Sequence, residues 1–389
     1  MMKISIDGKE LTGIIEKVSC NMKKEGYLSK ILLVDDGNNL QASVLKSAEA
    51  YLEIYTDNYV SHLNRADLKL DKILLDFADL KLLTSMKNEV IIEETEENIL
   101  VQNNGKTIKL IKYDTLEFAD FSFALANDNT LMLEFNESEF QEIISNFSKF
   151  TGNGKNNDTM SSIHFNINDN RIEALDGHRL ITRCLKVKEK ITENGKIQID
   201  ARIKNDLGKV LDKKSIGVIQ IIDGGKIVRV IGDGFRYNQR KREKDFFKVN
   251  PMLSDDYNYA FNVDAKKMLE HIKYYTDNVI DKKKHFTPVL FNISSDNITT
   301  YIENTRVKVS DKLKITNFKG KEKDLIITFN TWSMLDALKI ADGEEIYCTA
   351  TSPTAPLMIY SSSYAFLILP IKVKDELKAQ LQEILDNEK

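Results

Sequence analysis

The stretch Asp176-Gly177-His178-Arg179 holds the residue types in this chain most able to do chemistry. An aspartate two residues from a histidine could orient the imidazole as a general base. Catalytic carboxylate–histidine pairs usually join residues far apart in sequence, however, and no G-x-S-x-G nucleophile motif is present. Asp and Gly together are typical of a turn, in which His and Arg support neighbouring strands. The pattern leaves open an enzyme that uses His178 with Asp176, but it favours the turn, and we predict no catalytic residue.

The remaining histidines and the cysteines show no ligand pattern. His62, His164, His271 and His285 have no partner at i,i+4 and no cysteine at metal-ligand spacing. The cysteines Cys20, Cys184 and Cys348 are widely spread without a CxxC pair, as in reduced cytosolic proteins. No Walker loop or dinucleotide fingerprint occurs either. We therefore expect no metal and no cofactor.

The composition indicates a folded protein with sizeable cores. Of 389 residues, 42% are hydrophobic and 29% are charged, which argues against global disorder. No apolar run approaches the roughly 20 residues that span a bilayer, and the N-terminal MMKISIDGKEL lacks the apolar stretch of a secretory signal. A cytoplasmic location is the expectation. The net charge of −4 excludes a surface that is basic throughout but permits local basic faces.

A strand followed by a helix recurs three times along the chain. Strands predicted at 3–6, 131–135 and 259–263 each lead into apolar residues at i, i+3, i+4 and i+7, the spacing of one helical face. The three sets are Leu11, Ile14, Ile15 and Val18; Phe140, Ile143, Ile144 and Phe147; and Met268, His271, Ile272 and Tyr275. Their offsets are 129 and 128 residues. The spacing predicts three equivalent helices in three repeats.

A second helix is expected about halfway through each repeat. Asp76, Asp200 and Asn330 each stand between a predicted strand and an apolar helix face, where a side-chain oxygen can cap the first N–H groups. The offsets are 124 and 130 residues, and the rest of each repeat is typical of short antiparallel strands with hairpin turns. The predicted class is α+β, with domains at 1–128, 129–256 and 257–374 and an acidic tail at 375–389. Two interpretations remain open: a plain threefold duplication, or a ring with helices on one side and sheets on the other.

Two patches link this layout to a known family. The stretches ALDGHRL at 174–180 and AFLILPIK at 365–372 resemble the beta subunit of bacterial DNA polymerase III, the beta sliding clamp. That family shows a T-D-G-H-R-L stretch in its middle domain and a hydrophobic-Pro-hydrophobic-basic stretch at its end. The layout matches over essentially the whole chain, while residues match closely only in these patches. This is typical of a divergent member, and the sequence leaves a phage, plasmid or chromosomal origin open.

The resemblance implies three tandem DNA-clamp domains, each with two helices packed on antiparallel sheets, that form a ring as a head-to-tail homodimer. Such a ring is a processivity factor in DNA replication: it encircles double-stranded DNA without sequence preference and tethers the replicative polymerase. The implied partners also include a clamp loader and other proteins with clamp-binding motifs. The alternative is a clamp-fold adaptor that recruits transcription or repair factors to DNA. Neither function is enzymatic.

The resemblance also implies a peptide-binding pocket between the middle and last domains. By position its lining would be Met160, Leu175, Gly177, His178, Arg179, Leu180, Lys248, Val249, Phe286, Asn330, Pro356, Leu367, Leu369, Pro370, Ile371 and Lys372. Apolar side chains there would receive the leucine or phenylalanine anchors of a peptide. The chain departs from the family where Leu175 replaces threonine, where 243–246 lacks a proline, and where Lys372 replaces a terminal arginine. These changes bear on peptide preference more than on the fold.

The charge distribution suits a ring around a polyanion. The expected helix windows (9–24, 77–87, 137–150, 201–214, 264–279 and 331–341) hold 16 basic and 12 acidic residues, and the rest of the chain holds 39 and 47. Basic helices inside and acidic sheets outside would favour DNA within the hole. The candidate DNA-facing residues are Lys17, Lys23, Lys24, Lys81, Lys149, Lys155, Arg202, Lys204, Lys209, Lys266, Lys273 and Lys339. For each of them, a merely solvated position is the alternative.

Two further segments are singled out for contacts with partners. The basic run at 236–248 (RYNQRKREKDFFK) is interpreted as a loop that is either solvated or contacts phosphate or an acidic partner. The surfaces expected to join two copies are the end of the first domain, around 108–113, and the helix at 264–279. A head-to-tail interface closes into a ring only if its rotation sums to a full turn.

Overall fold

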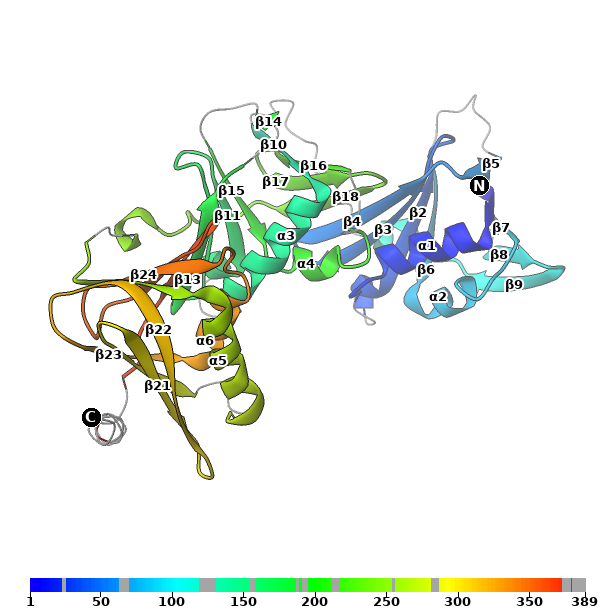
Figure 1. The fold of residues 1–389 in the computed structure, drawn as a ribbon. Coiled ribbons are helices and arrows are strands. Elements are labelled where there is room, and N and C mark those ends of the chain that lie inside the picture. Colours follow the sequence, from blue (N-terminus) through cyan, green and yellow to red (C-terminus); the bar gives the residue numbers. More distant parts are fainter. Residues whose placement is uncertain are drawn as a thin grey trace. The chain divides into compact units, whose positions relative to one another are not determined.

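The computed structural model describes residues 1–22, 26–62, 70–118, 131–153, 158–186, 189–190, 195–211, 217–253, 256–280, 287–372 and Ala379. The chain divides into two compact units, Met1–Ser145 with Val187–Glu243 and Asn146–Lys186 with Lys244–Lys389. The architecture is α+β, as predicted, with short helices packed on antiparallel sheets (Figure 1). Among the helices of the described chain, none has the length and apolar character needed to cross a membrane.

The first unit begins with a strand and helix that match the predicted pattern. Strand β1 (Lys3–Asp7) leads into α1 (Gly8–Val18), which buries Leu11, Ile14, Ile15 and Val18. The Asp7 carboxylate caps α1 by accepting from the Lys9 N–H at 2.8 Å. Around β1 lies a sheet in the order β5 (Tyr59–Ser61), β1, β7 (Glu89–Glu94), β8 (Asn98–Asn103) and β9 (Lys106–Ile111).

A longer sheet of the first unit joins two repeats edge to edge. Its order is β14 (Glu189–Lys190), β10 (Leu131–Asn136), β16 (Val218–Asp223), β17 (Ile227–Gly232), β18 (Phe235–Arg240), β4 (Ala50–Thr56), β3 (Leu40–Ser47), β2 (Lys30–Asp35) and β6 (Asp71–Asp76). Strands β18 and β4 form the junction, where Tyr237 pairs with Leu52. Both side chains are buried, so the core continues across the junction.

The second unit contains an equivalent junction. Its strands follow the order β11 (Ser162–Asn166), β12 (Arg171–Leu175), β13 (Arg179–Cys184), β26 (Tyr364–Ile368), β25 (Leu357–Tyr360), β24 (Glu345–Ala350), β19 (Tyr259–Asp264), β22 (Lys308–Gly320), β21 (Asn297–Glu303), β20 (Pro288–Ile293) and β23 (Leu325–Asn330). Strands β13 and β26 form the junction, and the buried pair is Ile181 with Phe366. The last strand of one repeat thus pairs with a hairpin strand of the preceding repeat in both units.

The first helix of each repeat agrees with its predicted face. Helix α3 (Glu137–Phe147) carries Phe140, Ile143, Ile144 and Phe147 in the core, and α5 (Ala265–Asn278) buries Met268, Ile272 and Tyr275. His271 at the fourth position of α5 is half-buried and lies 3.3 Å from the Asp311 carboxylate. The i, i+3, i+4, i+7 spacing was therefore sufficient to identify these helices.

The second helices agree at two places and differ at the third. Asp76 caps α2 (Phe77–Leu83), and Asn330 caps α6 (Thr331–Leu338) by accepting from the Trp332 N–H at 3.1 Å. Helix α4 (Ile203–Asp206) is much shorter than the helix predicted at 201–214. The chain forms turns at 207–210 instead. Gly208 follows directly, and glycine is unfavourable inside a helix. Strand β15 (Lys196–Asp200) ends at Asp200, whose carboxylate accepts from the Arg202 backbone N–H at 2.9 Å, as expected of a cap, and also binds the guanidinium groups of Arg202 and Arg242.

Candidate functional site

An apolar cluster lies on one face of the second unit, across four adjacent strands. Leu175 in β12 pairs with Leu180 in β13, and Leu180 pairs with Leu367 in β26. Met358 in β25 is the next neighbour, opposite Leu367. Since cross-strand partners share a face of the sheet, these side chains form one continuous apolar row. All of them are buried, so another segment must cover them.

The cover comes from the chain that follows β18. Phe246 and Val249 complete the buried cluster, and Met160, Phe247, Leu253 and Tyr360 pack on it while only partly buried. Phe246 also stacks on His164 with ring centroids 4.4 Å apart, and His164 Nδ1 lies 2.9 Å from the Glu173 carboxylate. The result is an apolar surface with a rim of side chains that still have room to move.

The Asp176–Arg179 stretch is the turn that the residue types suggest. Asp176 Oδ1 accepts from the backbone N–H groups of His178 and Arg179 at 2.9 and 3.0 Å, and Gly177 has φ of 89°. The other carboxylate oxygen of Asp176 accepts from Arg179 Nε at 2.8 Å. Because these bonds occupy the carboxylate and His178 is exposed, the geometry does not support Asp176 as the orienting partner of a catalytic histidine.

Arg179 faces the side of β13 opposite to Leu180. Its guanidinium donates to Asp336 of α6 at 2.7 Å and to the Lys149 carbonyl at 2.6 Å, and lies over the Phe150 ring at 4.8 Å. Burial by itself would lower the pKa of Arg179, but the hydrogen bonds to Asp336 and Asp176 outweigh it and raise that pKa above its usual value. Arg179 therefore connects helices to the hairpin rather than extending the apolar row.

Residues 369–372 follow the end of β26. The Leu369 N–H donates to the His178 carbonyl and the Ile371 N–H to the Thr328 carbonyl, each at 2.9 Å. Leu369 is exposed, Pro370 and Ile371 are half-buried and Lys372 is exposed. These residues lie beside the hairpin that carries Leu180 but are not members of the buried cluster.

The predicted pocket residues therefore divide into groups. Leu175, Leu180, Val249, Leu367 and Met160 meet in the cluster. Gly177 touches it, since a Cβ built there would lie 3.6 Å from the Met160 methyl carbon. Lys248 is exposed, Pro356 is half-buried, Asn330 is engaged in capping α6, and Phe286 lies outside the described residues. Sequence reasoning missed Phe246, Phe247, Leu253, Met358 and Tyr360. For Met358 and Tyr360 the signal was strand alternation opposite Leu367.

The predicted DNA-facing residues are mostly exposed. Lys17, Lys81, Lys209, Lys266, Lys273 and Lys339 are exposed, and Lys149 and Lys204 are half-buried. Lys23, Lys24 and Lys155 lie outside the described residues. Arg202 differs, because its guanidinium binds the Asp200 carboxylate at 2.8 Å. That carboxylate partly neutralises Arg202, which weakens it as a phosphate ligand.

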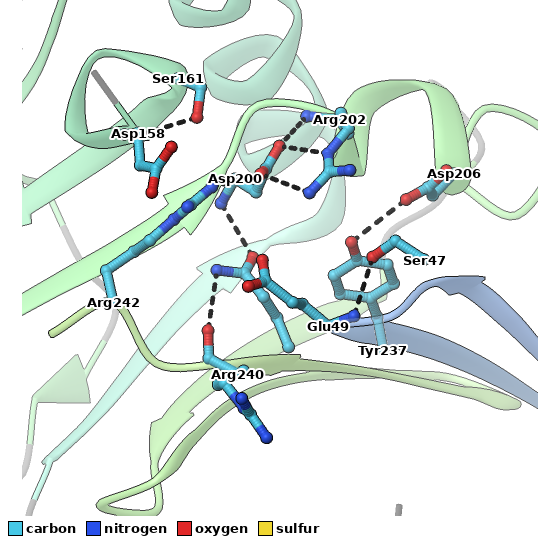
Figure 2. A network of polar contacts seen from close by, with 11 residues as sticks. Ser47, Glu49, Asp158, Ser161, Asp200, Arg202, Asp206, Tyr237, Arg240 and Arg242 are labelled. Atoms are coloured by element: carbon cyan, nitrogen blue, oxygen red, sulfur yellow. Dashed lines mark hydrogen bonds and ion pairs between the residues drawn. The ribbon is translucent and has the colours of Figure 1, made fainter. Parts of the chain in front are cut away.

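The basic run at 236–248 is not simply the loop that was expected. Its first residues, Arg236–Arg240, form β18, because they continue the alternation of the sheet. Arg236 lies 3.6 Å from the Glu53 carboxylate, and Lys241 pairs with Asp223. Arg242 reaches Asp200 at 2.6 Å, next to Arg202 (Figure 2). Much of the positive charge is thus neutralised within the first unit.

The junction in the first unit contains a buried amine. Lys46, near the end of β3, donates to the carbonyls of Val18 and Cys20 at the end of α1. Burial lowers the pKa of Lys46 to about 8, and the nearby carboxylate of Asp206 in α4 opposes that shift. Asp206 in turn accepts from the Tyr237 hydroxyl at 3.1 Å (Figure 2). The first unit thus holds a buried cation close enough to an aspartate of α4 for the carboxylate to influence the pKa of the amine.

Comparison with known proteins gives the fold. No family model matches the chain, and no curated protein matches it. Three solved structures are similar over 96% of this chain and 100% of their own: a putative DNA polymerase III beta subunit from Eubacterium rectale (21% identity, TM-score 0.85), the DNA polymerase sliding clamp from Bacillus subtilis (16%, 0.84) and the DNA polymerase III beta subunit from Thermotoga maritima (16%, 0.77). The chain therefore has the fold of DNA polymerase III beta sliding clamps, with a divergent sequence.

Proposed function

We propose that this chain, which has the beta sliding clamp fold, is itself a DNA sliding clamp: a processivity factor that encircles double-stranded DNA and tethers a replicative polymerase. The apolar row of Leu175, Leu180 and Leu367 carries the proposal, because it lies where the family resemblance implies the peptide pocket. A clamp loader and other proteins with clamp-binding motifs would be the further partners. The clamp would act in the cytoplasm and would catalyse no reaction.

The chemistry of the row suits apolar peptide anchors. Met160, Tyr360 and Phe247 are only partly buried at its margin, so they can shift to admit a leucine or phenylalanine side chain. Water leaves both surfaces when such an anchor enters, which supplies the binding free energy. Leu175, where the family has threonine, makes this surface more apolar than the family pattern. We infer a preference for peptides with larger apolar anchors.

Binding to DNA would be electrostatic and independent of sequence. The exposed lysines on the helices, such as Lys17 on α1 and Lys266 and Lys273 on α5, offer mobile positive charges rather than a shaped base-reading surface. Contacts of that kind attract phosphates and weaken as salt is added. Retention on DNA would then depend on closure of the ring around the duplex. A head-to-tail homodimer closes it in the simplest way.

The deciding experiment compares retention of the full-length chain on circular and linear DNA and its stimulation of the replicative polymerase. A clamp stays on circular DNA, slides off linear DNA and raises polymerase processivity. The pocket variant Leu369→Ala/Ile371→Ala should abolish the stimulation and leave the dimer mass and thermal melting unchanged. Leu116→Ala, at an exposed leucine of the first unit, is the control. Loss of the dimer in the pocket variant would refute the pocket assignment.

The same experiment separates the adaptor alternative. A clamp-fold adaptor would be retained on circular DNA but would not stimulate the polymerase. Pull-down with a replicative polymerase, before and after Leu369→Ala/Ile371→Ala, identifies which class of partner uses the predicted pocket.

A further inference from the structure

We propose that the C-terminal segment 373–389 docks on the apolar row of its own chain and competes there with partner peptides. This inference rests on the proposed peptide-binding role of the row and concerns how that role is regulated. The segment and the row belong to the same compact unit, the second. Within 373–389 the structure describes Ala379, which is helical and exposed.

The C-terminal segment carries an apolar stripe. Leu377, Leu381, Ile384 and Leu385 follow the spacing i, i+4, i+7, i+8, which predicts one face of an amphipathic helix. Ala379 would lie on the opposite side of that helix, in agreement with its exposure. Four large aliphatic side chains on one face form the kind of patch that folded proteins cover with another surface.

The apolar row offers a surface of the matching kind. Leu367 keeps 7% and Met358 keeps 6% of its surface exposed, whereas Phe366, on the other face of β26, is fully buried. The side chains that pack on the row, Met160 and Tyr360 among them, are only partly buried. A docked segment can therefore touch the row and its margin without unfolding a strand.

The same face of the sheet continues into an aromatic margin. Tyr360 stands two residues after Met358 in β25, and its cross-strand partner in β24 is Tyr347. The two rings lie 6.0 Å apart, and the exposed Tyr257 meets Tyr347 edge-on at 6.4 Å. This margin widens the apolar surface beyond what a single peptide side chain needs, and it suits an occupant as broad as a helix.

The stripe and the row have similar lengths. From Leu175 to Met358 the row crosses four neighbouring strands, a distance of about 14 Å at the usual spacing between strands. From Leu377 to Leu385 a helix rises by about 12 Å. The apolar side chains of the segment can therefore cover the row from one end to the other.

The connection to the segment is long enough for it to return to the row. The chain is held as far as Ile371, whose N–H donates to the Thr328 carbonyl at 2.9 Å. Leu367 stands five residues before Lys372, and Leu377 stands five residues after it. Five residues span at most about 17 Å, so the path that leaves the row and the path that leads back to it have the same reach.

Tethering makes even a weak contact effective. A segment joined by a short link has a local concentration of about 1 mM. If the free segment bound the row with a dissociation constant of about 0.1 mM, the tethered one would weaken the binding of a competing peptide by about tenfold. The row would then be open mainly to partners whose anchors bind more strongly than the chain's own segment.

Occupancy of the row can be observed directly in the full-length chain through the methyl NMR signals of Met160 and Met358. Leu381→Asp/Ile384→Asp places carboxylates in the stripe and should shift both signals, because the segment leaves the row. Ala379→Asp/Gln382→Asp adds the same charges away from the stripe and is the matched control, with no shift expected. The difference should not depend on protein concentration. A difference that appears only at high concentration would mean docking on a second copy and would overturn the proposal.

A binding experiment tests the competition, with a labelled synthetic peptide of residues 373–389 as the probe. By fluorescence anisotropy it should bind Leu381→Asp/Ile384→Asp about tenfold more tightly than wild type, whose row is already covered. Leu175→Thr, added to that variant, should weaken the binding again. Unshifted methionine signals together with equal affinities would overturn the docking, and the clamp function would stand if the chain is retained on circular DNA. Shifted signals in a chain that is not retained would support the docking and refute the clamp.

Discussion

Arg179 Nη1 lies 2.7 Å from Asp336 Oδ2, and this contact joins the β12–β13 hairpin to helix α6. Arg179 is half-buried and also satisfies the Lys149 carbonyl, so one guanidinium connects three segments of the second unit. The planar fork of arginine suits such a position, because it can donate in several directions at once. Stability of the apolar row should therefore depend on a residue on the opposite face of the same strand.

Replacing Arg179 with methionine should lower the free energy of unfolding by about 2 kcal/mol, because the Asp336 carboxylate and a backbone carbonyl lose a charged donor. Arg179→Lys should recover only part of the loss, since an ammonium group cannot reproduce the fork. Urea denaturation measures the effect. His178→Gln, at the exposed neighbour, serves as the control and should leave the midpoint unchanged. Equal stability of Arg179→Met and wild type would contradict the structural role.

Lys46 should make stability rise with pH over an alkaline window. Its pKa is lowered to about 8 in the folded chain from an ordinary value of 10.5, so between these values the unfolded chain binds more protons. The free energy of unfolding contributed by this group therefore increases from about pH 8 to 10.5 and is smallest below pH 8. The difference between wild type and Lys46→Met, followed by urea denaturation across that window, isolates it. A pH-independent difference would show that the amine is not buried as a charge.

Leu175→Thr should weaken the binding of a peptide with a leucine anchor by about tenfold, because it removes apolar surface from the row and adds a hydroxyl. Fluorescence anisotropy with a labelled peptide measures the dissociation constant. Leu116→Thr makes the same chemical change at an exposed position of the first unit. If both variants bind like wild type, the peptide does not use the row.

Thiol reactivity should follow burial. Cys184 is exposed, Cys20 is half-buried and Cys348 is fully buried, and burial raises the pKa of the Cys348 thiol, which further suppresses its thiolate. Iodoacetamide on the native chain should label Cys184 first, Cys20 more slowly and Cys348 only after unfolding. Peptide mass spectrometry gives the order. Early labelling of Cys348 would mean that β24 opens in the native state.

The helices were predictable where the information is local. Helix α1 could be predicted because the spacing of its apolar residues alone puts them on one face: Leu11, Ile14, Ile15 and Val18. Helix α4 was predicted too long because the apolar spacing continues past Gly208, where the chain forms turns. The contact of Asp200 with Arg242 is non-local, and no local pattern indicates it. Pairings such as β18 with β4 are non-local in the same way, so sequence spacing did not indicate them.

The candidate site was predictable in part for the same reason. The family resemblance rests on two short motifs, the hairpin around Gly177 and the stretch at 365–372 that contains Leu367. Phe246 and Val249 enter the cluster only because the connecting segment folds back over the strands. Their role depends on a tertiary path that the linear order of residues does not display.

The apolar row has a counterpart that is already occupied. At the junction of the first unit, Leu45 and Tyr51 take the places of Leu175 and Leu180, and the chain's own Phe118 and Tyr113 pack on them. In the β21–β22 hairpin the corresponding places hold Glu303 and Lys308. Few of the described junctions therefore offer an apolar surface that a peptide anchor could cover. If the row binds peptides, as we propose, two partner proteins cannot occupy it at the same time, and their concentrations and dissociation rates would decide which of them is bound.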